Sequence, residues 1–206
     1  MSNATRHITN RKVGIETRAD GGKIIVGYGA VFYRGDDAGT EYRIWSDMVE
    51  RINPGAFTRA LSEGQDVRGL FNHDSGRILG RTASGTMRLS VDAIGLKYEI
   101  DLPDTQEARD LATLIARGDI TGSSFAFGAN KTQWEDREDG LSIRTLMDVD
   151  LYDVGPVTYP AYESTSAAVR SAERDGLISE REQYRKMESQ TKTETDRVNT
   201  LRTLWG

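Results

Sequence analysis

The sequence predicts an α+β fold: a mostly antiparallel, barrel-like β-sheet with flanking helices, followed by a C-terminal helical tail. Short apolar and β-branched segments bounded by turn residues recur from residue 23 to residue 159, and two amphipathic segments interrupt them. Helices alternate with strands too rarely for a doubly wound parallel sheet. Residues 171–206 carry many charges and few large apolar side chains, as a solvated helix does.

Composition excludes several classes of protein. Hydrophobic residues make up 37% of the 206 residues, enough for one core, and no apolar run approaches the roughly 18 residues that cross a bilayer. The N-terminus lacks the apolar stretch of a secretory signal, so we expect the chain to work where it is made. The absence of cysteine excludes disulfides, thiol nucleophiles and zinc–thiolate sites. With 32 acidic and 27 basic residues, nucleic acid is not an expected partner, and without a long apolar run a membrane is not expected either.

The first half of the chain is expected to be mainly strands. Residues 1–21 form a flexible N-terminal segment without a fold signal, and residues 23–32 read as a strand. Residues 42–49 are a second strand or an irregular segment. A helix is expected over residues 53–64, with Asn53 as its cap and Pro54 in its first turn. Further strands are expected at the following segments: 67–72, 77–82, 85–91 and 94–102.

The second half opens with the clearest helix, residues 104–118, for which Asp104 and Glu107 have capping-box spacing and Gly118 is the stop. Residues 120–128 form a strand of small and aromatic residues, and residues 131–140 an exposed hairpin connection. Two more strands are expected, over residues 141–149 and 151–159, the second broken at Gly155-Pro156. The domains are therefore 1–21, a compact domain over 22–170 and a charged helical tail over 171–206.

Only two histidines are available as a general base, the side chain whose proton affinity best suits that role near neutral pH. His7 lies in the N-terminal segment and is not expected to be held firmly. His73 follows the apolar run 67–72, so the end of a strand anchors it. A catalytic histidine would therefore be His73, while an ordinary loop histidine is the alternative.

Without cysteine, the candidate nucleophile is a serine or threonine, and the segment Gly122-Ser-Ser-Phe-Ala-Phe127 is distinctive. Strand alternation places Ser124 on the face opposite Phe125 and Phe127. If the aromatic rings point into the core, Ser124 lies on a potentially accessible face. The alternative is that both serines are small packing residues.

Three acids of the segment 148–153 could orient the histidine. Alternation places Asp153 on the face of Val149 and Leu151, where a carboxylate would be costly to bury without a partner. That cost favours Asp153, and a surface acid is the alternative. A metal site made by His73, Asp74 and Asp66 is a weaker competitor without recognised ligand spacing, so no metal or cofactor is expected.

Seven segments of the chain, in order between residues 24 and 168, resemble the prohead proteases of tailed bacteriophages. They are Gly27-Tyr-Gly-Ala-Val-Phe32, Glu50-Arg-Ile-Asn-Pro-Gly-Ala-Phe57, Val67-Arg-Gly-Leu-Phe-Asn-His-Asp74, Leu79-Gly-Arg-Thr82, Gly85-Thr-Met-Arg-Leu89, Gly122-Ser-Ser-Phe-Ala-Phe127 and Asp153-Val-Gly-Pro-Val-Thr-Tyr-Pro-Ala-Tyr162.

The resemblance implies a serine endopeptidase with a fold similar to the herpesvirus assembly protease. It implies that Ser124 is the nucleophile and His73 the general base. Asp153 would be the third member, although the family usually has Glu there and the side chain is one methylene shorter; Asp150 is the reserve. Arg81 and backbone amides near Ser124 are the candidate oxyanion donors.

The same resemblance implies where such an enzyme acts. It would work in the host cytoplasm, inside the assembling procapsid. There it would cut scaffold or the scaffold-like segment of the major capsid protein, and it would also cut itself. A homo-oligomer is expected. The competing class is a catalytically inactive scaffold or capsid-assembly protein on the same fold, which would be expected to have lost at least one of the three site residues.

The tail is expected to be an assembly or tethering segment that catalysis does not need. Val198, Leu201, Leu204 and Trp205 follow helical spacing and give one short apolar stripe. A short helix is marginal alone in water, so the stripe should dock on a partner or a second copy. A chain ending near Arg170 is expected to fold and cleave. Lys186, Lys192 and Arg197 would be accessible points of self-cleavage.

Overall fold

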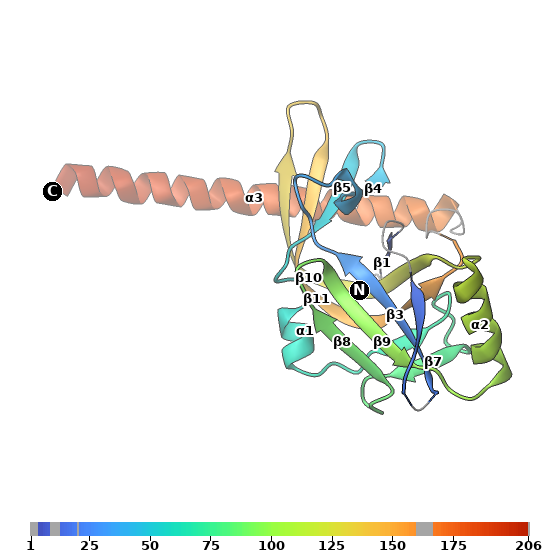
Figure 1. Ribbon diagram of the computed structural model, residues 1–206. Coiled ribbons are helices and arrows are strands. Elements are labelled where there is room, and N and C mark those ends of the chain that lie inside the picture. Colours follow the sequence, from blue (N-terminus) through green and yellow to red (C-terminus); the bar gives the residue numbers. More distant parts are fainter. Residues whose placement is uncertain (1–3, 9–12, 20, 160–166, 206) are drawn as a thin grey trace.

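The computed structural model describes residues 4–8, 13–19, 21–159 and 167–205 (Figure 1). The strands are β1 (Ala4–Ile8), β2 (Gly14–Thr17), β3 (Lys23–Val31), β4 (Tyr42–Trp45), β5 (Met48–Ile52), β6 (Arg68–Leu70), β7 (Ile78–Arg81), β8 (Met87–Val91), β9 (Gly95–Asp101), β10 (Gly122–Asp136) and β11 (Ser142–Val157). The helices are α1 (Thr58–Ser62), α2 (Gln106–Arg117) and α3 (Ala167–Trp205), with a 3-10 turn at Ala38–Thr40.

The described strands form two sheets. In the larger sheet the order is β1-β10-β11-β5-β4, and β6 adds to β11 and carries β7. Its long hairpin, β10 and β11, is antiparallel, whereas β5 and β6 both run parallel to β11. The smaller sheet has the order β2-β3-β9-β8 and is antiparallel throughout. The α+β class is therefore confirmed.

The expected barrel is wrong, because the sheets do not close on one another. They pack face to face around a shared core, to which β3 and β9 contribute Ile25 and Tyr98, and β10 and β11 contribute Phe125 and Val154. Both a barrel and a pair of packed sheets bury one face of each strand. The alternation of apolar residues could not tell these two architectures apart.

The helices begin later than the sequence suggested. Residues 53–57 form turns in which the Asn53 side chain accepts a hydrogen bond from the Gly55 amide, and α1 starts only at Thr58. At α2 the cap is Thr105, whose hydroxyl accepts from the Ala108 amide, rather than Asp104. Gly118 ends α2 in the left-handed conformation, as expected.

The two terminal segments carry more structure than expected. Residues 4–8 and 14–17, expected to lack a fold signal, form β1 and β2. At the other end β11 runs unbroken through Gly155-Pro156, and α3 starts at Ala167. The described part of the chain contains no helix long and apolar enough to cross a membrane.

The first part of α3 packs against the protein, and its far part extends away from it (Figure 1). Leu177 is buried against Ile44, Met48 and Trp134. Nearby, the buried Arg144 joins Glu180 of α3 (2.8 Å) to the fully buried Glu50 of β5 (2.6 Å). A specific, largely buried ionic contact therefore fixes the position of α3 on the sheet.

Candidate active site

Ser124 lies on β10, on the face opposite the core. Phe125 and Phe127 stack on each other in the core, with ring centroids 4.8 Å apart. Ser123 also faces the core, where its hydroxyl bonds that of the buried Tyr98 at 2.8 Å. Strand alternation then sends the Ser124 side chain the other way, as the sequence predicted. Ser124 is fully buried, however, which differs from the accessible position expected.

A β-bulge in β11 brings Asp153 to the same face as Ser124. Phe127 pairs with Leu151, but the preceding Ala126 pairs with Asp153, so Tyr152 has no partner in this ladder. An extra residue reverses the alternation beyond it. The expectation that Asp153 shares the face of Leu151 is therefore wrong, since Leu151 packs in the core and Asp153 faces the site.

His73 lies in the loop after β6, which pairs with β11 beside Asp153. Asn72 and His73 both have φ of +56°, the left-handed region that Asn tolerates better than most residues. Asn72 holds this conformation from the end of β11: its amide donates to the Pro156 carbonyl (3.1 Å), and its side-chain oxygen accepts from the Thr158 amide (2.8 Å). Its Nδ2 also donates to the Thr158 hydroxyl.

These three segments place the expected residues in one hydrogen-bonded chain. His73 Nδ1 lies 2.5 Å from Asp153 Oδ1, and His73 Nε2 lies 2.7 Å from Ser124 Oγ. The side chains of His73 and Asp153 are 23% and 13% exposed. Nearby, β6 approaches β11 so closely that a Cβ on Gly155 would lie 1.9 Å from the Leu70 carbonyl oxygen.

The order of the contacts determines what each group can do. An ionised carboxylate only accepts hydrogen bonds, so Asp153 requires the proton of a neutral imidazole to be on Nδ1. Nε2 then carries the free lone pair and can accept the Ser124 hydroxyl proton. A histidine protonated by that transfer would lie next to a carboxylate that stabilises its charge.

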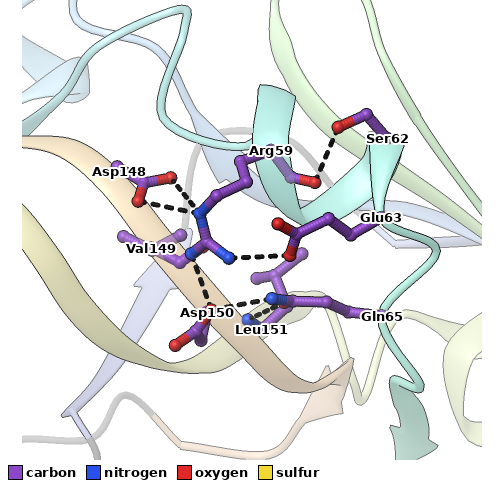
Figure 2. A network of polar contacts seen from close by, with 8 residues as sticks. All are labelled: Arg59, Ser62, Glu63, Gln65, Asp148, Val149, Asp150 and Leu151. Carbon is purple, nitrogen blue, oxygen red and sulfur yellow. Dashed lines mark hydrogen bonds and ion pairs between the residues drawn. The ribbon is translucent and has the colours of Figure 1, made fainter.

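Asp150, the reserve for the third member, belongs to a different network (Figure 2). Its carboxylate accepts from Arg59 Nη2 at 2.6 Å and from Gln65 Nε2 at 2.7 Å. Arg59 first, and then Gln65, hold the pKa of Asp150 below its usual range. Arg59 also pairs with Asp148, so this network fixes α1 to β11. Asp153 contacts His73 instead.

The other expected candidates lie elsewhere. Arg81 forms an ion pair with Asp66 on the surface, and Asp74 accepts from the Gly76 amide in a local turn. Among the residues that the structure describes, no group of three His, Asp or Glu side chains could hold a metal ion. The backbone of His7 lies in β1, opposite Ser124. The His7 side chain and those of Leu201, Leu204 and Trp205 lie outside the described residues.

A cleft of about 380 Å³ opens beside the loop that carries His73. Phe71 and Arg77 of this loop form one wall, and Leu111 and Leu114 of α2 form the other. Arg77 lies over the Phe71 ring, 4.2 Å from its centroid, and pairs with Glu107. The lining of the cleft is partly apolar, at Phe71, Leu111 and Leu114, and is otherwise made of polar and charged side chains.

A serine, an imidazole and a carboxylate in this order are the constellation of a serine hydrolase, and no such hydrolase needs a metal or cofactor for acyl transfer. Residues 10–177 of the chain match the caudovirus prohead serine protease family, and the chain belongs to that family. It is therefore a serine protease of bacteriophage prohead maturation.

The solved structure of the bacteriophage T4 capsid assembly protease is similar, with a TM-score of 0.49 and 13% sequence identity; the match covers 78% of this chain and 100% of that one. No curated protein matches the sequence.

Proposed function

We propose that Ser124 is the nucleophile, His73 the general base and general acid, and Asp153 the carboxylate that orients His73. The observation that carries this proposal is the unbroken hydrogen-bonded chain from Asp153 through His73 to Ser124. It joins three segments far apart in the sequence, and the histidine is held there in an uncommon backbone conformation. Strain of that kind occurs chiefly at functional sites.

The reaction follows from these contacts. As Ser124 Oγ forms a bond to the scissile carbonyl carbon, its proton moves to His73 Nε2. His73 then returns the proton to the leaving amine as the C–N bond breaks, which leaves an acyl-enzyme. A water molecule, deprotonated by the same nitrogen, then attacks the ester carbonyl; the bond between that carbon and Ser124 Oγ breaks, His73 returns the proton to Oγ, and the second product leaves. Asp153 stabilises the imidazolium in both halves.

The substrate that fits a prohead protease is scaffold, or the scaffold-like segment of the major capsid protein, and the reaction takes place inside the procapsid. The enzyme is also a substrate of itself. We further propose that the cleft between Phe71 and Leu114 receives a substrate side chain. Retention of all three site residues argues against an inactive assembly protein. The relation to the herpesvirus assembly protease and the homo-oligomer stay predictions.

The test is co-expression of the chain with the capsid or scaffold protein encoded beside it, followed by mass spectrometry of both. Wild type is expected to shorten its partner at a defined bond, and Ser124→Ala to leave it intact. Ser123→Ala is the matched control because it removes a hydroxyl one residue away, and it should still cleave. Cleavage by Ser124→Ala at the wild-type rate would overturn the proposal.

A further inference from the structure

The wall of the cleft between α2 and the loop after β6 has an apolar part and an acidic part. The apolar part is made of Phe71 and Leu111, which are 5% and 2% exposed, and of Leu114, which is 36% exposed. The acidic part is made of Glu107 and Asp110. Residues three and four apart lie on one face of a helix, so α2 presents its acids and its leucines to the cleft together.

The two carboxylates of the cleft differ in whether a cation already neutralises them. Glu107 forms an ion pair with Arg77, whose guanidinium also lies over the Phe71 ring. Asp110 accepts a hydrogen bond from Gln106 Nε2 at 2.6 Å, and no cation of the described residues pairs with it. An ionised carboxylate can accept about four hydrogen bonds, so Asp110 keeps acceptor capacity. Because Arg77 offsets Glu107, the lining carries one uncompensated negative charge, that of Asp110.

The side chains of lysine and arginine match both parts of this wall. Each lays a stem of methylene groups along apolar surface while its charged head reaches a polar group. At the Asp110 carboxylate the head would form a charge-assisted hydrogen bond, which is stronger than a neutral one. An apolar side chain would take water from Asp110 without replacing it, and an acidic one would be repelled.

The wall of the cleft and the proposed general base belong to the same turn. Three backbone hydrogen bonds close residues 71–77: the Phe71 amide donates to the Arg77 carbonyl (3.2 Å), the Asp74 amide to the Phe71 carbonyl (3.1 Å), and the Arg77 amide to the Asp74 carbonyl (2.9 Å). His73 lies within this turn, two residues after Phe71. A side chain bound in the cleft is therefore held against the segment that carries the base.

We propose that this cleft is a specificity subsite for a lysine or arginine side chain of the substrate, and that Asp110 is the residue that selects it. This inference rests on the proposed function, which makes the cleft a subsite for a substrate side chain. Segments that carry a basic residue at the matching position are then cut in preference to segments that carry an apolar or acidic one there. The exposed far part of α3 offers residues of this kind for self-cleavage: Lys186, Lys192 and Arg197.

The first test is the cleavage preference of the full chain on a mixture of synthetic peptides in which every residue type occurs at known frequency. Mass spectrometry of the products locates each cut. Wild type should enrich Lys and Arg about fivefold or more at one fixed position relative to the cut bond. Asp110→Asn should reduce that enrichment to about twofold or less, because the amide keeps the shape of the side chain without its charge.

Asp119→Asn is the matched control for this change. Asp119 is an exposed acid just after α2, paired with Arg117 and outside the lining of the cleft. This variant should keep the preference of wild type for a basic residue.

The second test uses the peptide that is cut best and the same peptide with methionine in place of its basic residue. Wild type should prefer the basic peptide by about five- to tenfold in kcat/KM, mainly through KM. Asp110→Asn should distinguish the two peptides by less than about twofold. The ratio of the two peptides is informative even if a variant is less stable, because a loss of folded enzyme affects both peptides equally.

Three results would overturn the proposal. A basic preference that is unchanged in Asp110→Asn, or a wild type that cuts peptides without any basic preference, would remove the subsite and leave the nucleophile intact. An acidic preference that is lost in Arg77→Gln would show that the cleft binds through Arg77 instead. If wild type cuts no peptide and a fluorophosphonate does not modify its Ser124, the proposed function fails and this inference fails with it.

Discussion

Asn72 and His73 share a backbone conformation that costs free energy for residues other than glycine. Asn72 is bound to the end of β11 by three hydrogen bonds, two to Thr158 and one to Pro156. The same strand carries Asp153. Asn72 therefore ties the loop of His73 to the strand that supplies the carboxylate, and it acts through His73 as a positioning residue.

Asn72→Ala should lower kcat about tenfold, the size expected for the loss of one or two hydrogen bonds, with a smaller effect on KM. Asn72→Asp keeps an acceptor for the Thr158 amide and should retain more activity. Steady-state kinetics on a peptide substrate and thermal unfolding would be measured for both. An Asn72→Ala enzyme with unchanged kcat would contradict this positioning role.

Ser123 offers a separate test, of stability rather than catalysis. Ser123→Ala leaves the buried Tyr98 hydroxyl without its partner, so the free energy of unfolding should fall by about 1–3 kcal/mol. Burial already raises the pKa of Tyr98, so the ring cannot compensate by ionising. Adding Tyr98→Phe should recover part of the loss in urea titrations. A single variant as stable as wild type would show that this bond contributes nothing.

At the scale of elements, the close approach of β6 to β11 sets the distance between His73 and Asp153. Gly155 permits it, because a side chain there would meet the Leu70 carbonyl oxygen. The bulge at Tyr152 then turns Asp153 toward His73. We expect both features to be needed for the 2.5 Å contact between the His73 ring and the Asp153 carboxylate.

Gly155→Ala should push β6 away from β11 and lower both activity and the free energy of unfolding, the latter by several kcal/mol. Gly176→Ala is the matched control: it lies within α3 with open space around it, and the same change there should stabilise the helix by about 0.5–1 kcal/mol. Activity assays and urea titrations on both variants would distinguish the effect at Gly155 from the effect at Gly176. Equal effects at both positions would contradict the close-approach argument.

The sequence led to Ser124 and His73 because the chain offers so few alternatives: one anchored histidine and one strand of small residues beside aromatic ones. It also favoured Asp153 over Asp150, but on the premise of unbroken alternation, which the bulge violates. Asn72 was missed, although an Asn before a His at the end of a strand is a signal for a left-handed turn. The pairing of β1 with β10 was not predictable, since local pattern does not specify distant partners.

At the scale of the whole molecule, the first part of α3 belongs with the protease domain. Leu177 covers apolar side chains of β4, β5 and β10, and Glu180 pairs with the buried Arg144. Arg181 and Arg185 pair with Asp136 at the tip of the long hairpin. We propose a domain boundary after about residue 185 in place of 170, with the remainder of α3 as the assembly or tethering segment.

A chain ending at Arg170 should therefore unfold at a lower urea concentration than the full chain. Its free energy of unfolding should fall by about 2 kcal/mol or more from the lost burial of Leu177 alone. A chain ending at Glu188 keeps the contacts of Leu177, Glu180 and Arg185 and should match the full chain in stability and in cleavage. If the shorter chain is as stable as the longer one, the original boundary at 170 is correct.

The central claim, that Ser124 is activated by His73, is tested most directly by finding which residue a fluorophosphonate modifies in the full chain. After prolonged reaction and tryptic digestion, the adduct should lie in the peptide 118–131, on Ser124 and not on Ser123. His73→Ala should slow its formation by about 100-fold or more, because the general base is lost. An adduct on another residue, or one that forms on Ser124 equally fast without His73, would contradict the claim.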